Sequence, residues 1–538
     1  MQFNKTYLPL LIGVALAAGV FIGSKLNFND TTEKIFATNS KKDKLNRLID
    51  YIDYEYVDQV NTDSIVDVTV NGILENLDPH SVYIPVDSYE ENADDMRGNF
   101  VGIGISYYPY NDSIAVIRAL NGGPAARAGI KGGDRILYAD GKPMFGEYFN
   151  RDSISAYLKG EKNSKVTLKV YRNGVDGLLE MTVRRKEVPL ISLDASYKIT
   201  NDIGYIKLNR FAETTHDEFD DALEALTDQG VSKLVLDLRN NPGGYIYTAE
   251  KILDEFLSKD KLLLITRNKK GEETRSYATR RGDFEKGAVY VLINENSASA
   301  SEIVAGALQD NDKGTIIGRR SFGKGLVQRE MALGDGSAVR LTIARYYTPT
   351  GRSIQKPYGN GNDAYFSEYE NRYRNGELLS ADSIQVADSL RFVTPKGKVV
   401  YGGGGIIPDV FVPKDTSIAS ETLAYVTRSG YMGNFVFQYL EENRGMFDAI
   451  SFEEFNRSYE VDTTLSEEFI AFARLSEARI DLSDYSEALK QAIKANIAQQ
   501  LYGQNAFELI LNEGDPMIRK VLELEGVVPV VTETAAQD

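Results

Sequence analysis

The spacing of apolar and polar residues predicts helices at both ends of the chain. From residue 41 to 97, apolar residues recur every three or four positions, which is the period of an amphipathic helix. The turn Leu77-Asp78-Pro79-His80-Ser81 ends this pattern, because the residue before a proline avoids the helical region. Beyond 405–410 the chain is again acidic and helical in its spacing. We therefore predict an N-terminal helical region at 26–97 and a C-terminal helical region at 414–538.

Between residues 98 and 186 the pattern changes to short runs that predict β-strands. The predicted strands cover 113–119, 165–171 and 179–185, with a turn at Asn173-Gly174. The region opens with apolar residues alternating with glycine: Phe100, Val101, Gly102, Ile103, Gly104 and Ile105. Consecutive N–H groups in such a loop form a concave anion site, and the adjoining strand edge accepts an extended peptide. This region is therefore predicted to be a β-rich domain.

From 187 to 413 the predicted strands alternate with predicted helices. The segment 233–238 is a buried strand that follows a helix over 215–229. A second apolar strand, 289–293, leads directly into a helix that begins near Ala300. Strands that alternate with helices favour a mostly parallel sheet with crossover helices.

The N-terminus carries a predicted targeting segment. Lys5 precedes an apolar run that extends from Tyr7 to Gly23, and Lys25 follows it. The run is short for a membrane span and suits a secretory signal. Because the run continues past the small residues Ala15-Leu16-Ala17, residues 1–25 are either a cleaved signal peptide or an uncleaved membrane anchor. Both alternatives predict export, which in a bacterium leads to the periplasm, with the protein either soluble or anchored to the inner membrane.

Composition narrows the classes of function. The 538 residues are 42% apolar and 26% charged, as expected for several folded domains. A net charge of −17 repels phosphates and argues against nucleic-acid binding. The chain has no cysteine, which excludes thiol nucleophiles and cysteine-bound metals. Its two histidines, His80 and His216, are too far apart in sequence to build a His-rich metal site without added carboxylates, so no metal and no cofactor are predicted. His216 is expected to be solvated, and His80 to be a hydrogen-bonding turn residue.

Two polar segments carry the candidate chemistry. The first, 294–302, lies where a buried strand ends and a helix begins. In it, Ser299 and Glu302 form a capping-box pattern, so a purely structural N-cap is one interpretation. The second, 318–328, nearly matches a phosphate-binding loop. The match fails at Gly325, where a hydroxyl should bind magnesium, and this argues against nucleotide binding.

Together these segments resemble the carboxy-terminal processing proteases, also called tail-specific proteases. The resemblance extends from Asp78 to Val412 and includes, in family order, DPHSVYIP, LDLRNNPGG, NSASASEIVAGALQD, GRRSFGKGLVQ, LTIARYYTPTGRSIQ and GIIPDV. Residues 98–186 resemble a PDZ domain through the run 123–136 and through 100–105, which matches that family's carboxylate-binding loop. The resemblance implies a multidomain chain. A β-rich PDZ domain at 98–186 would be inserted before an α/β serine-protease core at 187–413, with helical regions at both ends.

The resemblance also assigns catalytic roles. It implies that Ser299 is the nucleophile, that Lys324 is the general base and that Gln328 orients the lysine. A lysine base must be neutral near pH 7, which burial among apolar neighbours favours. Phe322, Leu326 and Val327 provide such neighbours, and no carboxylate lies within four residues of Lys324.

An oxyanion hole is expected beside Ser299. The Ala300 N–H lies at the start of a helix, where backbone donors are unpaired and the dipole favours negative charge. The resemblance implies a second donor from the Gly243-Gly244 turn, and Gly244 is the preferred choice. Asp310 also matches the family and is expected to be structural.

The sequence therefore predicts a serine endopeptidase that cleaves cell-envelope proteins and recognises their free, apolar C-termini through its PDZ domain. The alternative is a catalytically silent peptide-binding adaptor on the same scaffold, which the presence of Ser299, Lys324 and Gln328 argues against. The acidic helical ends either mediate a homodimer or are solvated, and the sequence leaves both open.

Overall fold

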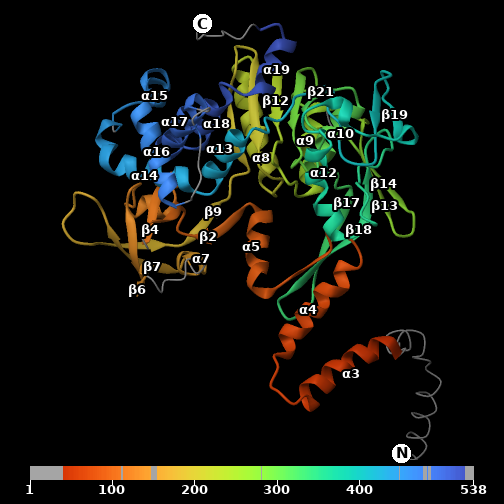
Figure 1. Cartoon of the computed structure of the whole chain (residues 1–538), viewed down its shortest axis with the longest axis horizontal. Helices are drawn as coiled ribbons and strands as arrows, with labels where there is room; N and C mark the ends of the chain where they lie inside the picture. The colour runs from red at the N-terminus through yellow and green to blue at the C-terminus, as the bar shows by residue number, and fades with distance from the viewer. Residues whose placement is uncertain are drawn as a thin grey trace, which may run out of the picture. The chain divides into compact units, whose positions relative to one another are not determined.

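The structure is a computed structural model, and it describes residues 40–110, 113–146, 154–279, 282–447, 449–476, 482 and 486–527. The chain divides into two units, 1–76 and 77–538 (Figure 1). The first unit holds two described helices, α3 (Ser40–Glu55) and α4 (Thr62–Glu75). Asn61 caps α4 by accepting a hydrogen bond from the Ser64 N–H. Among the described residues of this unit, Leu74 is the one buried apolar side chain, so the two helices share almost no core.

The second unit begins with the predicted turn and then enters the β-rich region. There β2 (Asn99–Gly102) pairs antiparallel with β9 (Lys186–Pro189), so the chain enters and leaves this region through one two-stranded ladder. A larger sheet has the order β3-β4-β5-β7-β8, with β3 at its edge. Its strands are β3 (Ile105–Tyr110), β4 (Ser113–Ala119), β5 (Arg135–Ala139), β7 (Lys165–Tyr171) and β8 (Leu179–Arg184), with β6 (Lys142–Pro143) beside β5 and helices α6 (Pro124–Arg127) and α7 (Ile154–Leu158).

A six-stranded sheet forms the centre of the second unit, in the order β10-β11-β12-β15-β16-β21. Only β10 and β11 run antiparallel, and each later pair is parallel. The strands are β10 (Leu193–Lys198), β11 (Ile203–Leu208), β12 (Lys233–Asp237), β15 (Ala288–Ile293), β16 (Gly314–Gly318) and β21 (Val410–Phe411). The strands predicted at 233–238 and 289–293 are β12 and β15, which agree with the prediction to within one residue at each end.

Helices cover both faces of this sheet. Leu234 and Leu236 of β12 pack with α8 (Thr215–Asp228), α9 (Ile246–Phe256) and α10 (Ala300–Asp310). Val235, between them, points to the opposite face and packs with Met517 and Val521 of α19 (Pro516–Leu524). Because both faces are covered, the strands are almost continuously apolar.

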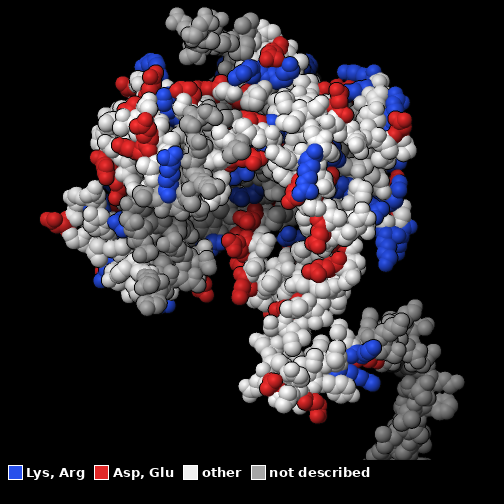
Figure 2. Space-filling model, viewed as in Figure 1, with Lys and Arg blue, Asp and Glu red and all other residues white. Residues whose placement is uncertain are grey.

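A second sheet of this unit, with the order β1-β18-β13-β14 and β17 beside β18, was not predicted. Its strands are β1 (Val82–Ile84), β13 (Leu262–Asn268), β14 (Glu273–Tyr277), β17 (Leu326–Ala332) and β18 (Ala338–Tyr347). β1 and β17 both pair with β18, so the turn at 77–81 lies close to the strand that carries Gln328. Helix α5 (Val86–Arg97) follows β1, and Figure 2 shows acidic side chains gathered over it. Helices α11 (Asn362–Phe366) and α12 (Glu368–Arg374) and strands β19 (Arg391–Val393) and β20 (Val399–Tyr401) follow β18.

The C-terminal region is helical, as predicted. It contains α13 (Ile418–Arg428), α14 (Tyr431–Asn443), α15 (Phe452–Ser458), α16 (Thr463–Ser476), α17 (Ser486–Tyr502), α18 (Gln504–Asn512) and α19. Phe435, Phe455 and Ile493 belong to its core. Tyr108 of β3 donates a hydrogen bond to the Gly433 carbonyl of α14 and packs edge-on against Phe437. These helices therefore contact the β-rich region.

The helices of the described segments are all too short or too polar to cross a bilayer. The targeting segment predicted at 1–25 lies outside the described residues.

Candidate active site

Ser299 lies at the N-cap of α10, just beyond the carboxyl end of β15. Its φ of 56° and ψ of −114° are rare for a residue with a side chain and impose backbone strain. A methyl group added at Gly243 would lie 2.7 Å from Ser299 Cβ and 2.8 Å from the Ala300 nitrogen. Only glycine fits there, so the Gly243-Gly244 turn packs directly against the candidate nucleophile.

The two glycines of this turn differ in their free donors. The Gly243 N–H donates to Asn241 Oδ1 at 2.9 Å. In the part of the chain that the structure describes, the N–H groups of Gly244 and Ala300 have no hydrogen-bond acceptor. Gly244 and Ala300 are the two residues expected to form the oxyanion hole, and the second donor remains a prediction from the family resemblance.

Lys324 lies in the loop between β16 and β17, and its Nζ donates to Gln328 Oε1 at 2.9 Å. Burial, together with the positive charge of Arg340, lowers the pKa of Lys324 to about 8. Two carboxylates that are distant in sequence, Glu302 and Asp78, raise this pKa. A substantial fraction of Lys324 is therefore neutral near pH 7 to 8, as a general base requires.

Gln328 is itself held by the turn at 77–81. Its Nε2 donates to the His80 carbonyl, so its Oε1 is directed toward Lys324. Asp78 shapes the turn, because its Oδ1 accepts hydrogen bonds from the N–H groups of His80 and Ser81, each at 3.0 Å. His80 was expected to be a hydrogen-bonding turn residue; the expectation did not include Gln328 as its partner.

The His80 ring is partly buried among aromatic side chains. Its Nε2 lies 2.7 Å from Tyr365 Oη, and its ring meets Phe322 edge-on. Burial lowers the pKa of His80 to about 4, with the nearby Lys324 charge acting in the same direction. This imidazole is therefore neutral at physiological pH, and its contact with the site is made by its main chain.

Two residues that sequence reasoning did not place in the site connect Ser299 with Lys324. Tyr346 Oη lies 3.0 Å from the Ser299 carbonyl oxygen and 2.5 Å from the Lys324 carbonyl oxygen, so its single hydroxyl hydrogen is shared between the two acceptors. The Glu302 carboxylate accepts the N–H groups of Ser299 and Lys324, each at 2.9 Å. Glu302 was interpreted only as a helix cap, and nothing in its local sequence indicates the second partner.

Asp310, at the other end of α10, lies in a structural network. It pairs with the fully buried Arg352 at 2.8 Å and accepts hydrogen bonds from the backbone and hydroxyl of Thr350. These contacts fix the end of the helix.

Of the predicted carboxylate loop, Phe100 to Gly102 lie in β2, paired with β9, and Ile105 begins the edge strand β3, so only Ile103 and Gly104 form the connection. Ile103 is buried in the core of the β-rich region, and Gly104 has a positive φ of 74° that favours glycine. The carbonyls of Ile103 and Gly104 accept hydrogen bonds from Ala125 and Leu120. The loop is thus anchored to the segment that carries the PDZ-like run.

The prediction that His216 is solvated was wrong. Its side chain is 14% exposed, and its Nε2 lies 3.3 Å from Glu255 Oε1, which is fully buried. Oxygens of Asp220, Glu255 and Asp283 also lie within 4.8 Å of one another, a group of possible metal ligands that the sequence did not anticipate. The hydrogen bond to Glu255 raises the pKa of His216. The spacing of α8 and α9, rather than any local motif, brings these residues together.

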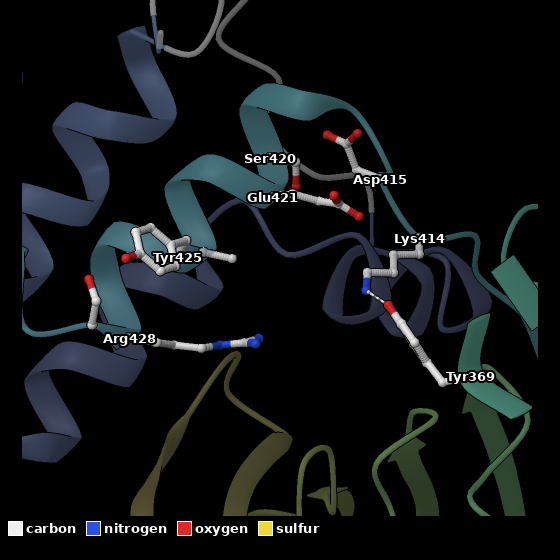
Figure 3. A pocket seen from close by; sticks show the side chains of 9 residues that line it. Tyr369, Lys414, Asp415, Ser420, Glu421, Tyr425 and Arg428 are labelled. Carbon is white, nitrogen blue, oxygen red and sulfur yellow. Dashed lines mark hydrogen bonds between the residues drawn. The ribbon is translucent and has the colours of Figure 1, made fainter. Parts of the chain in front are cut away.

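A pocket of about 480 Å³ lies between α12 and α13 (Figure 3). It is lined by Tyr369, Lys414, Asp415, Ser420, Glu421, Ala424, Tyr425, Arg428 and Ser429. Lys414 Nζ donates to Tyr369 Oη at 2.6 Å across it. None of the predicted catalytic residues lines this pocket.

Family comparisons match three parts of the chain. The profile of Peptidase family S41 matches residues 202–363, and that of the PDZ domain matches 101–183. Residues 422–503 match a family of unknown function, DUF8443.

Similar proteins include a carboxy-terminal-processing protease of Bartonella bacilliformis, which is 36% identical over 351 residues, 64% of this chain and 80% of that protein. The carboxy-terminal processing protease CtpA of Bacillus subtilis is 32% identical over 65% of this chain and 75% of its own length. Among solved structures, a photosystem II D1 C-terminal processing protease is 25% identical, with a TM-score of 0.36, and covers 69% of this chain and 86% of that one. The family profiles and the two curated relatives confirm the resemblance that the motifs indicate. The chain belongs to the carboxy-terminal-processing proteases of peptidase family S41, serine-type peptidases, and carries a PDZ domain.

Proposed function

We propose that Ser299 and Lys324 form the catalytic dyad of this peptidase, with Gln328 orienting the lysine. The observation that carries the proposal is the state of Lys324: its amine is buried, its pKa is lowered to about 8, and its Nζ hydrogen bond is made to a neutral amide. A serine hydroxyl needs a base to become a nucleophile, and neither histidine ring contacts Ser299 among the described residues.

In the proposed reaction, neutral Lys324 takes the proton of the Ser299 hydroxyl as Oγ attacks the scissile carbonyl. The N–H groups of Gly244 and Ala300 donate to the oxyanion of the tetrahedral intermediate. Protonated Lys324 then gives its proton to the departing amine, which leaves an acyl-enzyme at Ser299. A water molecule, deprotonated by the same lysine, hydrolyses the ester and restores the free serine.

The dyad is tested by substitution in the full chain, with an unstructured protein bearing an apolar C-terminus as the substrate. Ser299→Ala and Lys324→Ala should each abolish cleavage. His80→Ala should retain most of it, because Gln328 contacts the His80 main chain. His216→Ala should retain cleavage per folded molecule, although loss of the Glu255 partner is expected to lower stability. Turnover that survives in Lys324→Ala would contradict a lysine base.

We also propose that the loop 100–105 of the PDZ domain, at 98–186, binds the free, apolar C-termini of protein substrates. The segment leads into β3, which is an edge strand among the described strands of its sheet, and an edge strand can pair with an added peptide strand. With the predicted export signal at 1–25, these substrates are proteins of the cell envelope, and the enzyme acts in the periplasm. The silent-adaptor alternative is not favoured, because the nucleophile and a lysine of lowered pKa are both present.

We further propose a homodimer formed by α3. Its exposed apolar side chains include Leu48 at 55%, Tyr51 at 64% and Tyr54 at 81% exposure. In the first half of α3 the described charged side chains are Asp43, Lys44 and Arg47, and the second half is acidic through Asp50, Asp53 and Glu55. An antiparallel pair of α3 helices places Lys44 and Arg47 of each helix against the acidic half of the other, as a two-fold interface requires.

A further inference from the structure

Glu302 is a fully buried carboxylate at the third position of α10. It accepts four hydrogen bonds. Oε2 receives the N–H groups of Ser299 and Lys324, each at 2.9 Å, and Oε1 receives the Gly323 N–H at 2.7 Å and the Ser321 hydroxyl at 2.5 Å. Capping of α10 would need only the Ser299 bond. The other three come from the lysine-bearing loop, so one carboxylate binds two segments that are distant in sequence.

Tyr346 of β18 makes the complementary contacts. Its hydroxyl is bonded to the carbonyl oxygens of Ser299 and Lys324, at 3.0 and 2.5 Å, and its side chain is fully buried. Glu302 holds the N–H group of each of these two residues, and Tyr346 holds the C=O group of each. Each backbone polar group of Ser299 and Lys324 is therefore contacted by one of these two side chains, and the Ser299 carbonyl also accepts the N–H groups of Glu302 and Ile303 within α10.

Such fixation matters at this pair for two reasons. Ser299 has a strained φ of 56°, which persists only where surrounding contacts determine it. Lys324 reaches the site on a long flexible side chain, so the position of its backbone decides whether Nζ comes within reach of Ser299 Oγ.

The burial of Glu302 is also not explained by an ion pair. No cationic side chain lies within 4 Å of its carboxylate in the part of the chain that the structure describes, and burial raises its pKa to about 6. An unpaired buried carboxylate is costly to a fold unless its hydrogen bonds compensate for lost hydration.

We propose that Glu302 and Tyr346 are positioning residues that hold Ser299 and Lys324 in reacting register by binding the backbone of both. The proposal rests on the Ser299–Lys324 dyad proposed above. Neither side chain takes part in bond making. They act by fixing the distance and the direction between the nucleophile and its base.

The first test is Tyr346→Phe in the full chain, measured as kcat and KM on the unstructured protein substrate. The change removes one hydroxyl and no charge. The expected result is a fall in kcat of roughly a hundredfold with little change in KM, because misplaced reacting groups lose rate rather than binding. The midpoint of the rise in kcat with pH should stay in place.

The second test is Glu302→Gln, with kcat followed against pH. The amide cannot accept from every donor that the carboxylate serves, so kcat should again fall. In addition, the negative charge of Glu302 raises the pKa of Lys324, so its removal should move the rise in kcat to lower pH. The other groups that act on Lys324, Arg340, Asp78 and His80, are unchanged in this variant. Glu302→Asp retains the charge and should leave the midpoint near its original pH.

The control is Glu508→Gln, which removes another buried carboxylate of the same unit, one paired with Lys207. It should lower thermal stability and leave both kcat per folded molecule and the pH midpoint unchanged. If Tyr346→Phe and Glu302→Gln behave like this control, the two residues are merely structural and the proposal is wrong. Failure of the dyad itself would look different, because Ser299→Ala or Lys324→Ala would then still cleave.

Discussion

The pKa of the Lys324 amine is set by opposing electrostatic influences. Burial and Arg340 lower its pKa, whereas Glu302 and Asp78 raise it, and the result is about 8. The sequence showed only the apolar neighbours of Lys324, because both carboxylates reach it from distant parts of the chain. A base whose pKa is near the working pH combines a large neutral fraction with adequate basicity.

We expect activity to rise with pH through a midpoint near 8. The neutral form of Lys324 is the active base, and this form predominates above its pKa. Single-turnover cleavage rates between pH 5 and 10 measure the midpoint. His80, whose pKa is about 4, should add no second transition in the range from 5 to 7. A single-turnover rate that stays constant from pH 5 to pH 10 would argue against a lysine base.

At the scale of single residues, each sequence motif predicts the site residues of its own segment. The motifs do not reveal the hydrogen-bond partners that come from other segments. Ser299, Lys324 and Gln328 could be named from their runs. The contact of Gln328 with the His80 carbonyl, and the two bonds of Tyr346, depend on strands β1, β17 and β18 coming together. No local spacing encodes such tertiary pairing.

Among the elements, the segment 100–105 and the edge strand β3 are the ones that we propose for substrate recognition. Strands with clear apolar runs, such as β12 and β15, were predictable because burial on both faces leaves a strong local signal. The sheet built from β1, β18, β13 and β14 was not, because its strands are partly exposed and far apart in sequence.

Amidation of a substrate's C-terminus should slow its cleavage. The proposed loop donates backbone hydrogen bonds to a terminal carboxylate. Loss of that charge is expected to lower the binding free energy by about 1.5–3 kcal/mol, which weakens the affinity about ten- to a hundredfold. Initial rates at limiting concentrations of one protein substrate, with free and amidated ends, measure the effect. Short peptides that reach Ser299 directly serve as the control and should show little difference. Equal rates for the two protein substrates would mean that the loop does not read the terminus.

On the scale of the whole molecule, the first unit is the part least able to stand alone. Leu74 is the one buried apolar side chain among its described residues, and isolated helices of this length are marginal in water. Its helices were predictable from the periodicity of their apolar residues. That periodicity does not show which surface covers their exposed apolar side chains.

The proposed dimer predicts a response to charge reversal along α3. Lys44→Glu with Arg47→Glu should weaken self-association of the full chain, because it places acidic residues against the acidic half of the partner helix. Adding Asp50→Lys and Glu55→Lys to the same chain should restore it. Sedimentation equilibrium measures both effects, and Lys520→Glu on α19 is the control. A chain that is monomeric throughout, or one that binds anionic vesicles through α3 instead, would contradict the dimer.

The pairing of β2 with β9 indicates that the PDZ domain can be deleted from the chain. Asn99 and Pro189 are directly paired across it, so the two points where the chain enters and leaves the PDZ domain are neighbours in space. A short bridge between the flanking residues would therefore excise the domain and keep intact both the turn that orients Gln328 and the segment that carries Ser299. The turn at 77–81 precedes the PDZ domain in the chain and the proposed catalytic residues follow it, yet the contact between Gln328 and the His80 carbonyl does not involve the domain. A chain shortened in this way is expected to keep the fold of the peptidase core, because the two crossings already lie side by side.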